Sequence, residues 1–121
     1  MQKLTNAEAE IMNWLWQLGR GTVSQLMAIM PQPAPPQSTI SSFIRILEKK
    51  GFVGHEAYGK THVYFPMISK DDYGRRSLGE LVRDYFDGSA SRLVSFLVAD
   101  EKLSEKELFE LRQKLDSLDD Q

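Results

Sequence analysis

The sequence of 121 residues contains no cysteine, which excludes disulfides and cysteine-based metal sensing. No apolar run is long enough to cross a bilayer or to serve as a signal peptide, so we expect a cytoplasmic protein without membrane insertion. The sequence also lacks a glycine-rich phosphate loop, a nucleophile paired with a base, and a recognisable acid pair. These absences argue against an enzyme, and we assign no catalytic residue, metal or cofactor.

An overall excess of basic residues is missing too. The net charge is -2, whereas nucleic-acid-binding domains are usually basic. Residues 1–70 carry seven Lys and Arg against four Glu, a net charge of +3, and residues 71–121 carry eight against thirteen acidic residues, a net charge of -5. This asymmetry predicts that the N-terminal part meets phosphate while the C-terminal part meets something else.

A helix with two contrasting faces is predicted from Ser38 to the glycine at Gly51. One face is apolar at the spacing of a buried stripe, with Ile40, Phe43, Ile44 and Leu47. The opposite face has short hydroxyls early and cations late: Ser38, Thr39, Ser41, Ser42, Arg45 and Lys49. Short polar groups suit a surface that must approach another polar surface closely, so this pattern is typical of a helix that reads DNA.

A β-hairpin is predicted after this helix, with strands at residues 52–57 and 60–65, a turn at Tyr58-Gly59, and Pro66 closing the second strand. A helix followed by such a wing is the second half of a winged helix-turn-helix. The residue expected to contact phosphate is Lys60 at the tip, and the weaker candidates are Tyr58, Thr61 and His62.

Two histidines face each other in this predicted register, His55 and His62. Two imidazoles make only half a zinc site, and no cysteine or spare carboxylate beyond Glu56 completes it. We therefore favour a structural cross-strand pair, or one histidine near phosphate, over a metal site.

Two further amphipathic helices are predicted upstream. A capping box of Thr5 and Glu8 opens the first, whose apolar set is Ala7, Ile11, Trp14, Leu15 and Leu18. The second begins at Thr22 and carries Val23, Leu26, Met27 and Met30, and the proline-rich segment 31–36 then forbids helix. We interpret Trp14 as core, whereas Trp16 packs at a junction or stays partly exposed, with a ligand role as the minor alternative. Residues 1–68 are thus predicted to form a winged helix-turn-helix domain.

Residues 69–121 are predicted to form a helical dimerisation domain, which makes the fold mainly α with a small hairpin wing. Ser69 is expected to cap a helix that ends at residues 87–89, where a second, short helix follows. Ser104 is expected to cap the third and last helix. The apolar positions are Leu78, Leu81, Val82, Tyr85, Phe86, Leu93, Val94, Phe96, Leu97, Leu108, Leu111, Leu115 and Leu118. Three short helices do not easily bury all these side chains against one another, so we expect a partner, most simply a second copy.

The chain resembles the BlaI/MecI family of bacterial repressors, the penicillinase-repressor family of winged-helix proteins, from Leu4 to about Leu118. The motifs are Leu4-Thr5-Asn6-Ala7-Glu8, Trp14-Leu15-Trp16, Leu47-Glu48-Lys49-Lys50-Gly51-Phe52-Val53 and Leu103-Ser104. The resemblance implies a homodimer whose winged heads occupy successive major grooves of a palindromic operator and whose C-terminal helices intertwine. It also implies repression of resistance or stress genes, often including the repressor's own operon. The operator contacts carried over by position are Ser38, Thr39, Ser41, Ser42 and Arg45.

The resemblance further implies release from DNA through a membrane-bound sensor with a metalloprotease domain. In the family the cut falls near an Asn-Phe bond in the helix before the last one. Here the equivalent stretch has no asparagine beside its phenylalanine, and the corresponding cleavage region is Ser95, Phe96 and Leu97. Copper-responsive relatives use a C-terminal cysteine cluster, which this chain lacks.

One alternative of a different class is a winged-helix module for protein association without sequence-specific DNA binding, because the fold alone does not dictate function. A protein-binding version should expose apolar or acidic residues on the helix face that here carries hydroxyls, Arg45 and Lys49. The residue pattern therefore favours DNA.

Overall fold

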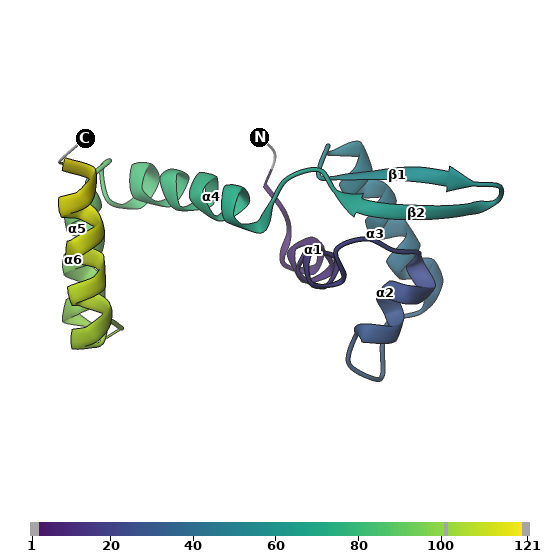
Figure 1. Cartoon of the computed structure of the whole chain (residues 1–121), viewed down its shortest axis with the longest axis horizontal. Coiled ribbons are helices and arrows are strands. Elements are labelled where there is room, and N and C mark those ends of the chain that lie inside the picture. Colours follow the sequence, from purple (N-terminus) through teal and green to yellow (C-terminus); the bar gives the residue numbers. More distant parts are fainter. Residues whose placement is uncertain (1–2, 101, 120–121) are drawn as a thin grey trace. The chain divides into compact units, whose positions relative to one another are not determined.

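The computed structural model describes residues 3–100 and 102–119 of the chain, with side chains through Gln113. It divides into two compact units, Met1–Gly74 and Arg75–Gln121. The first unit holds α1 (Asn6–Leu18), α2 (Val23–Ile29) and α3 (Gln37–Lys49), followed by an antiparallel hairpin (Figure 1). Helices α4 (Lys70–Tyr85), α5 (Ala90–Ala99) and α6 (Glu105–Asp119) follow. The predicted mainly α fold with a hairpin wing is confirmed, and no described helix is long and apolar enough to cross a membrane.

Local sequence signals start the first two helices. The Glu8 N–H donates to the Thr5 hydroxyl at 3.2 Å and the Thr5 N–H donates to the Glu8 carboxylate at 2.9 Å, which is the predicted capping box. Thr22 and Gln25 form a second capping box at the head of α2, with distances of 3.1 and 2.9 Å. This second box was not predicted, although glutamine can take the place of glutamate in the motif.

Helix α3 ends in a Schellman motif, as its lysines and glycine lead one to expect. Gly51 has a φ of 89°, its N–H donates to the Glu48 carbonyl at 3.0 Å, and the Phe52 N–H donates to the Leu47 carbonyl at 2.9 Å. Leu47 and Phe52 are both almost fully buried, which supplies the apolar contact that usually accompanies this motif. Helix α3 is therefore joined directly to the start of the hairpin.

The hairpin consists of β1 (Val53–Tyr58) and β2 (Thr61–Pro66), joined by Gly59-Lys60. The predicted turn at Tyr58-Gly59 is wrong by one residue, and both predicted strands shift with it. Gly59 has a φ of 65°, which suits the first central position of a type II′ turn. Pro66 was predicted to follow the second strand, but it is the last residue of β2 and lies opposite Val53.

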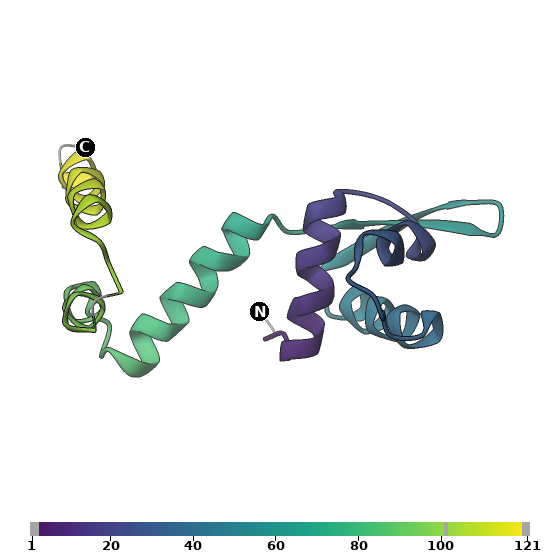
Figure 2. The ribbon, with the colours of Figure 1, turned by 90° about the horizontal axis from the view of Figure 1, so that it is seen from below.

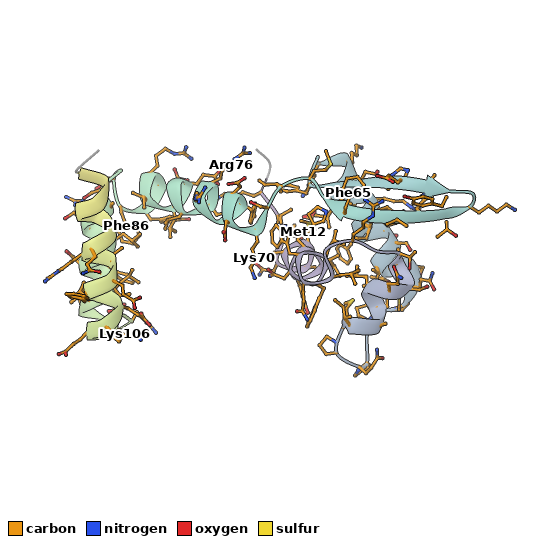
Figure 3. The ribbon with its side chains drawn as sticks, in the orientation of Figure 1. Met12, Phe65, Lys70, Arg76, Phe86 and Lys106 are labelled. Carbon is orange, nitrogen blue, oxygen red and sulfur yellow. The ribbon has the colours of Figure 1, made fainter. Side chains whose placement is uncertain are left out.

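The core of the first unit lies between its three helices and the base of the hairpin, an arrangement visible from two directions in Figures 1 and 2. Ala7, predicted within the stripe of α1, is exposed instead. Met12 was missed by the periodicity argument, yet it is fully buried and is labelled in Figure 3. The buried apolar residues are Ile11, Met12, Leu15, Leu26, Met30, Ile40, Ile44, Leu47, Phe52 and Val53, with Trp14, Leu18, Val23, Met27 and Phe43 partly buried around them.

The helices of the second half of the chain start on serine caps. The Oγ atoms of Ser69, Ser89 and Ser104 accept backbone hydrogen bonds at 3.0, 3.2 and 3.1 Å. Asp87 and Gly88 have φ values of 52° and 77°, so the predicted break between α4 and α5 is a reversal in left-handed conformation. Each cap satisfies a backbone donor that the first turn of a helix leaves without a partner.

Apolar side chains remain exposed on α4, α5 and α6. No side chain described in these helices is fully buried, although the rings of Phe86 and Phe96 pack with centroids 5.8 Å apart. The exposed members are Leu78, Leu81, Tyr85, Phe96, Val98 and Phe109. Those partly buried are Val82, Phe86, Leu93, Val94, Leu97, Leu108 and Leu111. The side chains of Leu115 and Leu118 lie outside the described residues.

Candidate nucleic-acid interface

The outward face of α3 is a continuous polar ridge. Ser38, Ser42, Arg45 and Lys49 recur at the spacing of one helix face, and all four are exposed. Thr39 is exposed beside them, and Ser41 is half-buried at the edge. The Ser42 hydroxyl donates to the Ser38 carbonyl at 2.9 Å, which leaves its lone pairs free to accept. No acidic residue lies on this ridge.

One apolar residue on the exposed side of α3 was not predicted to be there. Ile46 is 44% exposed and lies next to the ridge, off the buried stripe of Ile40, Ile44 and Leu47. An exposed aliphatic group among hydroxyls and cations is suited to contact with a thymine methyl group. The signal was present in the sequence, because Ile46 is the only isoleucine in α3 that breaks the helical spacing of the others.

The tip of the wing borders a hollow of about 270 Å³. Its walls come from the wing tip and from the starts of α2 and α3: Thr22, Val23, Ser24, Gln37, Lys60, Thr61, His62 and Tyr64. The wall contains a cation, hydroxyls and an amide but no carboxylate, which is the composition expected of a place for a phosphate group. Thr22, Ser24 and Gln37 were not predicted as site residues, because only the tertiary fold brings them to Lys60.

The wing is joined to the helices by backbone hydrogen bonds. The Gly21 N–H donates to the Tyr64 carbonyl at 3.0 Å, and the Tyr64 N–H donates back to the Gly21 carbonyl at 2.8 Å. A Cβ atom at Gly21 would lie 2.7 Å from both Leu18 Cδ2 and Gln25 Oε1. A side chain at position 21 would therefore displace the ends of the Leu18 and Gln25 side chains.

Side-chain contacts of Arg20 reinforce the same junction. Its guanidinium donates to Tyr58 Oη at 3.2 Å, forms an ion pair with Glu56 at 2.9 Å, and lies 5.4 Å from the centroid of the Phe65 ring. The Tyr58 hydroxyl also donates to Glu56 at 2.7 Å. Hydrogen bonds from Tyr58 and Arg20 hold the pKa of the Glu56 carboxyl below its ordinary value.

These contacts separate the predicted wing residues into two groups. The pairing of Tyr58 with Thr61 and of Ala57 with His62 places Tyr58 and His62 on opposite faces of the hairpin. The Tyr58 hydroxyl is bonded to the Glu56 carboxylate, whereas Lys60, Thr61 and His62 line the hollow. The structure thus groups three of the four predicted wing residues with α2 and α3.

The two histidines lie diagonally and not directly across the hairpin. His55 is opposite Tyr64, and His62 is opposite Ala57, so the predicted direct pairing is wrong because the turn is displaced. Their rings nevertheless stack, with centroids 4.5 Å apart and planes at 17°. His55 Nδ1 pairs with the Glu48 carboxylate at the end of α3. Among the described residues no three His, Cys, Asp or Glu side chains cluster as a metal site. The pair of His55 with Glu48 connects the wing with α3.

Three helices, a polar ridge on the third, and a hairpin whose tip adds a cation beside that ridge define a winged helix-turn-helix protein of the nucleic-acid-binding class. The family model described as penicillinase repressor matches residues 4–117, and the chain belongs to this family.

Known proteins agree with this assignment. The chain is 27% identical over 114 residues to the methicillin resistance regulatory protein MecI of Staphylococcus aureus (strain N315), covering 93% of each chain. It is 24% identical over 115 residues to the penicillinase repressor of Bacillus licheniformis, covering 94% of this chain and 90% of that protein. The solution structure of the DNA-binding domain of the repressor BlaI matches with a TM-score of 0.51 and 27% identity, over 60% of this chain and 94% of that domain.

Membership in this family makes the chain a transcriptional repressor and not an enzyme. Both the resemblance that the motifs indicate and the expectation of a non-enzymatic protein are therefore confirmed. The match extends through both compact units, because it begins in the first and ends in α6.

Proposed function

We propose that the chain binds a palindromic operator sequence-specifically as a homodimer. The observation that carries this proposal is the acid-free ridge of α3 beside the hollow at the wing tip, which holds Lys60 and no carboxylate. A recognition helix in the major groove needs short or bidentate polar groups toward base edges and cations toward the backbone. The ridge supplies both.

The residues proposed to contact base edges lie in the first two turns and the middle of α3. Ser38, Thr39, Ser41 and Ser42 present hydroxyls that donate or accept at base edges or phosphates. Arg45 has a planar guanidinium that donates two parallel hydrogen bonds to guanine or to a phosphate. Exposed Ile46 adds an apolar contact to the same surface.

The residues proposed to contact phosphate lie at the two ends of this surface. Lys49 lies exposed in the last turn of α3, and Lys60 with Thr61 and His62 lines the hollow that Ser24 and Gln37 complete. A phosphate in the hollow would be held by the wing and by two helices at once. Tyr58 contributes less, because its hydroxyl is already bonded to Glu56.

The dimer contacts belong to α4, α5 and α6. Leu78, Leu81, Tyr85 and Phe96 are exposed in the single chain, and the half-buried residues beside them extend the apolar surface. Residues 71–121 carry a net charge of -5, which disfavours contact with DNA and leaves protein as the partner. Residues 69–121 therefore serve as the dimerisation domain, and residues 1–68 as the DNA-binding domain.

Relief of repression is proposed to follow cleavage in α5, triggered by a membrane-bound sensor metalloprotease. Ser95 and Phe96 are exposed and Leu97 is half-buried in the described structure. A cut there would remove α6 and part of α5 from the dimer surface. Two linked heads would then become separate heads, each with only its own share of phosphate contacts.

Fluorescence anisotropy of the purified full chain on a duplex from upstream of its own operon tests the operator proposal. A salt series and a scrambled duplex accompany each titration. The expected result is selective binding of two chains per duplex, with log affinity falling by about 0.9 per phosphate contact for each unit of log salt. Equal weak binding to both duplexes across several upstream regions would instead favour a winged helix that associates with protein.

A further inference from the structure

A groove on the first unit lies away from the ridge of α3 and the wing tip. It has a volume of about 740 Å³ and runs between α1 and the segment in which the chain leaves β2 and enters α4. Lys70, labelled in Figure 3, stands at this segment. The volume is in the range of small-molecule sites, and none of the residues proposed to contact DNA lines it.

The groove has an aromatic wall. Both tryptophans of the chain, Trp14 and Trp16, line it. The Trp16 ring is held in place, because its indole N–H donates to the Ile68 carbonyl at 2.8 Å and its ring packs against Tyr73 with centroids 5.9 Å apart. Met67 is 61% exposed at the same groove, and thioethers pack favourably against aromatic rings. Such a wall favours a flat aromatic molecule.

Four side chains of the groove carry donors that have no partner among the described residues. Lys70 forms no ion pair with any described residue, and the Trp14 indole N–H and the side-chain amides of Asn13 and Gln17 make no hydrogen bond to one. No Asp or Glu lines the groove. One unpaired cation beside neutral donors is complementary to a monoanion.

We propose that this groove binds a planar aromatic carboxylate, with its rings against the tryptophan wall and its carboxylate at Lys70. The assignment does not depend on the operator proposal, because it rests on the composition of the groove alone. It would give this repressor a site for a small molecule in addition to its DNA surface.

Isothermal titration calorimetry of the full chain with 2-naphthoate tests the proposal without DNA, and 2-naphthamide serves as the neutral molecule of the same shape. The expected result is saturable binding of naphthoate, about tenfold tighter than naphthamide, because only the carboxylate can form an ion pair with Lys70. In a ¹⁵N-labelled sample, the indole N–H resonance of Trp14 should shift during the same titration.

Two exposed substitutions locate the site. Lys70→Gln should abolish the preference for naphthoate, and Met67→Glu should weaken naphthoate about tenfold while affecting naphthamide less, because it places an anion in the groove. Lys3→Gln removes an exposed cation that does not line the groove and should change nothing. Circular dichroism verifies that each variant is folded.

The absence of saturable binding, equal affinity for the two compounds, or an unchanged preference in Lys70→Gln would overturn the proposal. Failure of this experiment leaves operator binding untouched, since anisotropy measures it separately. Conversely, if the chain proved not to bind an operator, the naphthoate affinity measured in the absence of DNA would be unaffected.

Discussion

Glu8 is the one acidic side chain buried among the described residues, with 3% of its surface exposed. Burial by itself would raise the pKa of this carboxyl, but hydrogen bonds from Lys50 and from the backbone and hydroxyl of Thr5 outweigh it and hold the pKa below the ordinary value of 4.5. Both carboxylate oxygens lie 2.7 Å from Lys50 Nζ. The capping box was predictable because it is local, whereas the partner 42 residues away was not.

Lys50→Met should lower the free energy of unfolding by about 3 kcal/mol, since it leaves a buried carboxylate without its cation. Glu8→Gln should cost less, about 1–2 kcal/mol, because the amide retains the cap and the remaining ammonium of Lys50 can turn toward water. Urea unfolding at neutral pH measures both values. Equal losses in the two variants would contradict the argued asymmetry.

The same carboxyl gives a prediction for acid. Since the pKa of Glu8 is lower in the folded chain than its ordinary value of 4.5, its contribution is present above that value and is lost as the pH falls through the folded pKa. Wild-type stability should therefore decline below about pH 4.5 more steeply than that of Glu8→Gln. Parallel declines in thermal unfolding across this range would show that other carboxyls dominate.

Arg45 and Lys49 provide a matched pair on the ridge of α3. Arg45→Ala should weaken operator binding by about 1–3 kcal/mol and relax discrimination against the scrambled duplex, if its guanidinium reads a base. Lys49→Ala should weaken binding to both duplexes similarly and make the salt slope shallower by about one contact. Anisotropy titrations decide the roles, and a uniform loss in Arg45→Ala would reassign it to phosphate.

At the scale of elements, helix ends were predictable and strand register was not. Helix starts were predictable from Thr5, Ser69 and Ser104, because each hydroxyl accepts a hydrogen bond from the backbone N–H three residues later. The register of the hairpin instead depends on Gly59 occupying the first turn position, and on hydrogen bonds from Gly21 to Tyr64 and from Met67 to Phe52. Such non-local partners leave no periodic trace in the sequence, and the same is true of the hollow that gathers Ser24, Gln37 and Lys60.

Two glycines test how α3 is terminated. Gly51 has a φ of 89° and Gly74 lies within α4, and a Cβ atom on either would meet nothing within 4 Å. Gly51→Ala should therefore destabilise the chain by about 1–2 kcal/mol through the left-handed conformation alone. Gly74→Ala should stabilise it by about 0.5–1 kcal/mol, since alanine suits a helix better. Midpoints of urea unfolding that move in the same direction would refute this account.

At the scale of the whole chain, net charge and exposed apolar side chains differ between residues 1–70 and residues 71–121. The sequence asymmetry of +3 against -5 and the apolar positions of α4–α6 were readable without a structure, because both are sums over segments. Phe109 was not singled out, since it lies off the stripe of Leu108 and Leu111, yet it is 62% exposed. A large ring left in solvent by the single chain is a natural contact for a second copy.

Phe109→Glu should convert the proposed dimer to monomers at concentrations where the wild type is expected to remain dimeric. In the single chain the substitution costs little because position 109 is exposed, whereas at a dimer interface it would bury an unpaired charge. Sedimentation velocity measures the change, and Glu110→Gln, at the neighbouring exposed position, is the control.

Operator affinity should fall together with dimerisation. The salt slope for the first bound chain should approach half its wild-type value, because one head makes half the phosphate contacts. A Phe109→Glu variant that stays dimeric would place the interface elsewhere on α4–α6, and Leu81→Glu on α4 would then be the next substitution to measure.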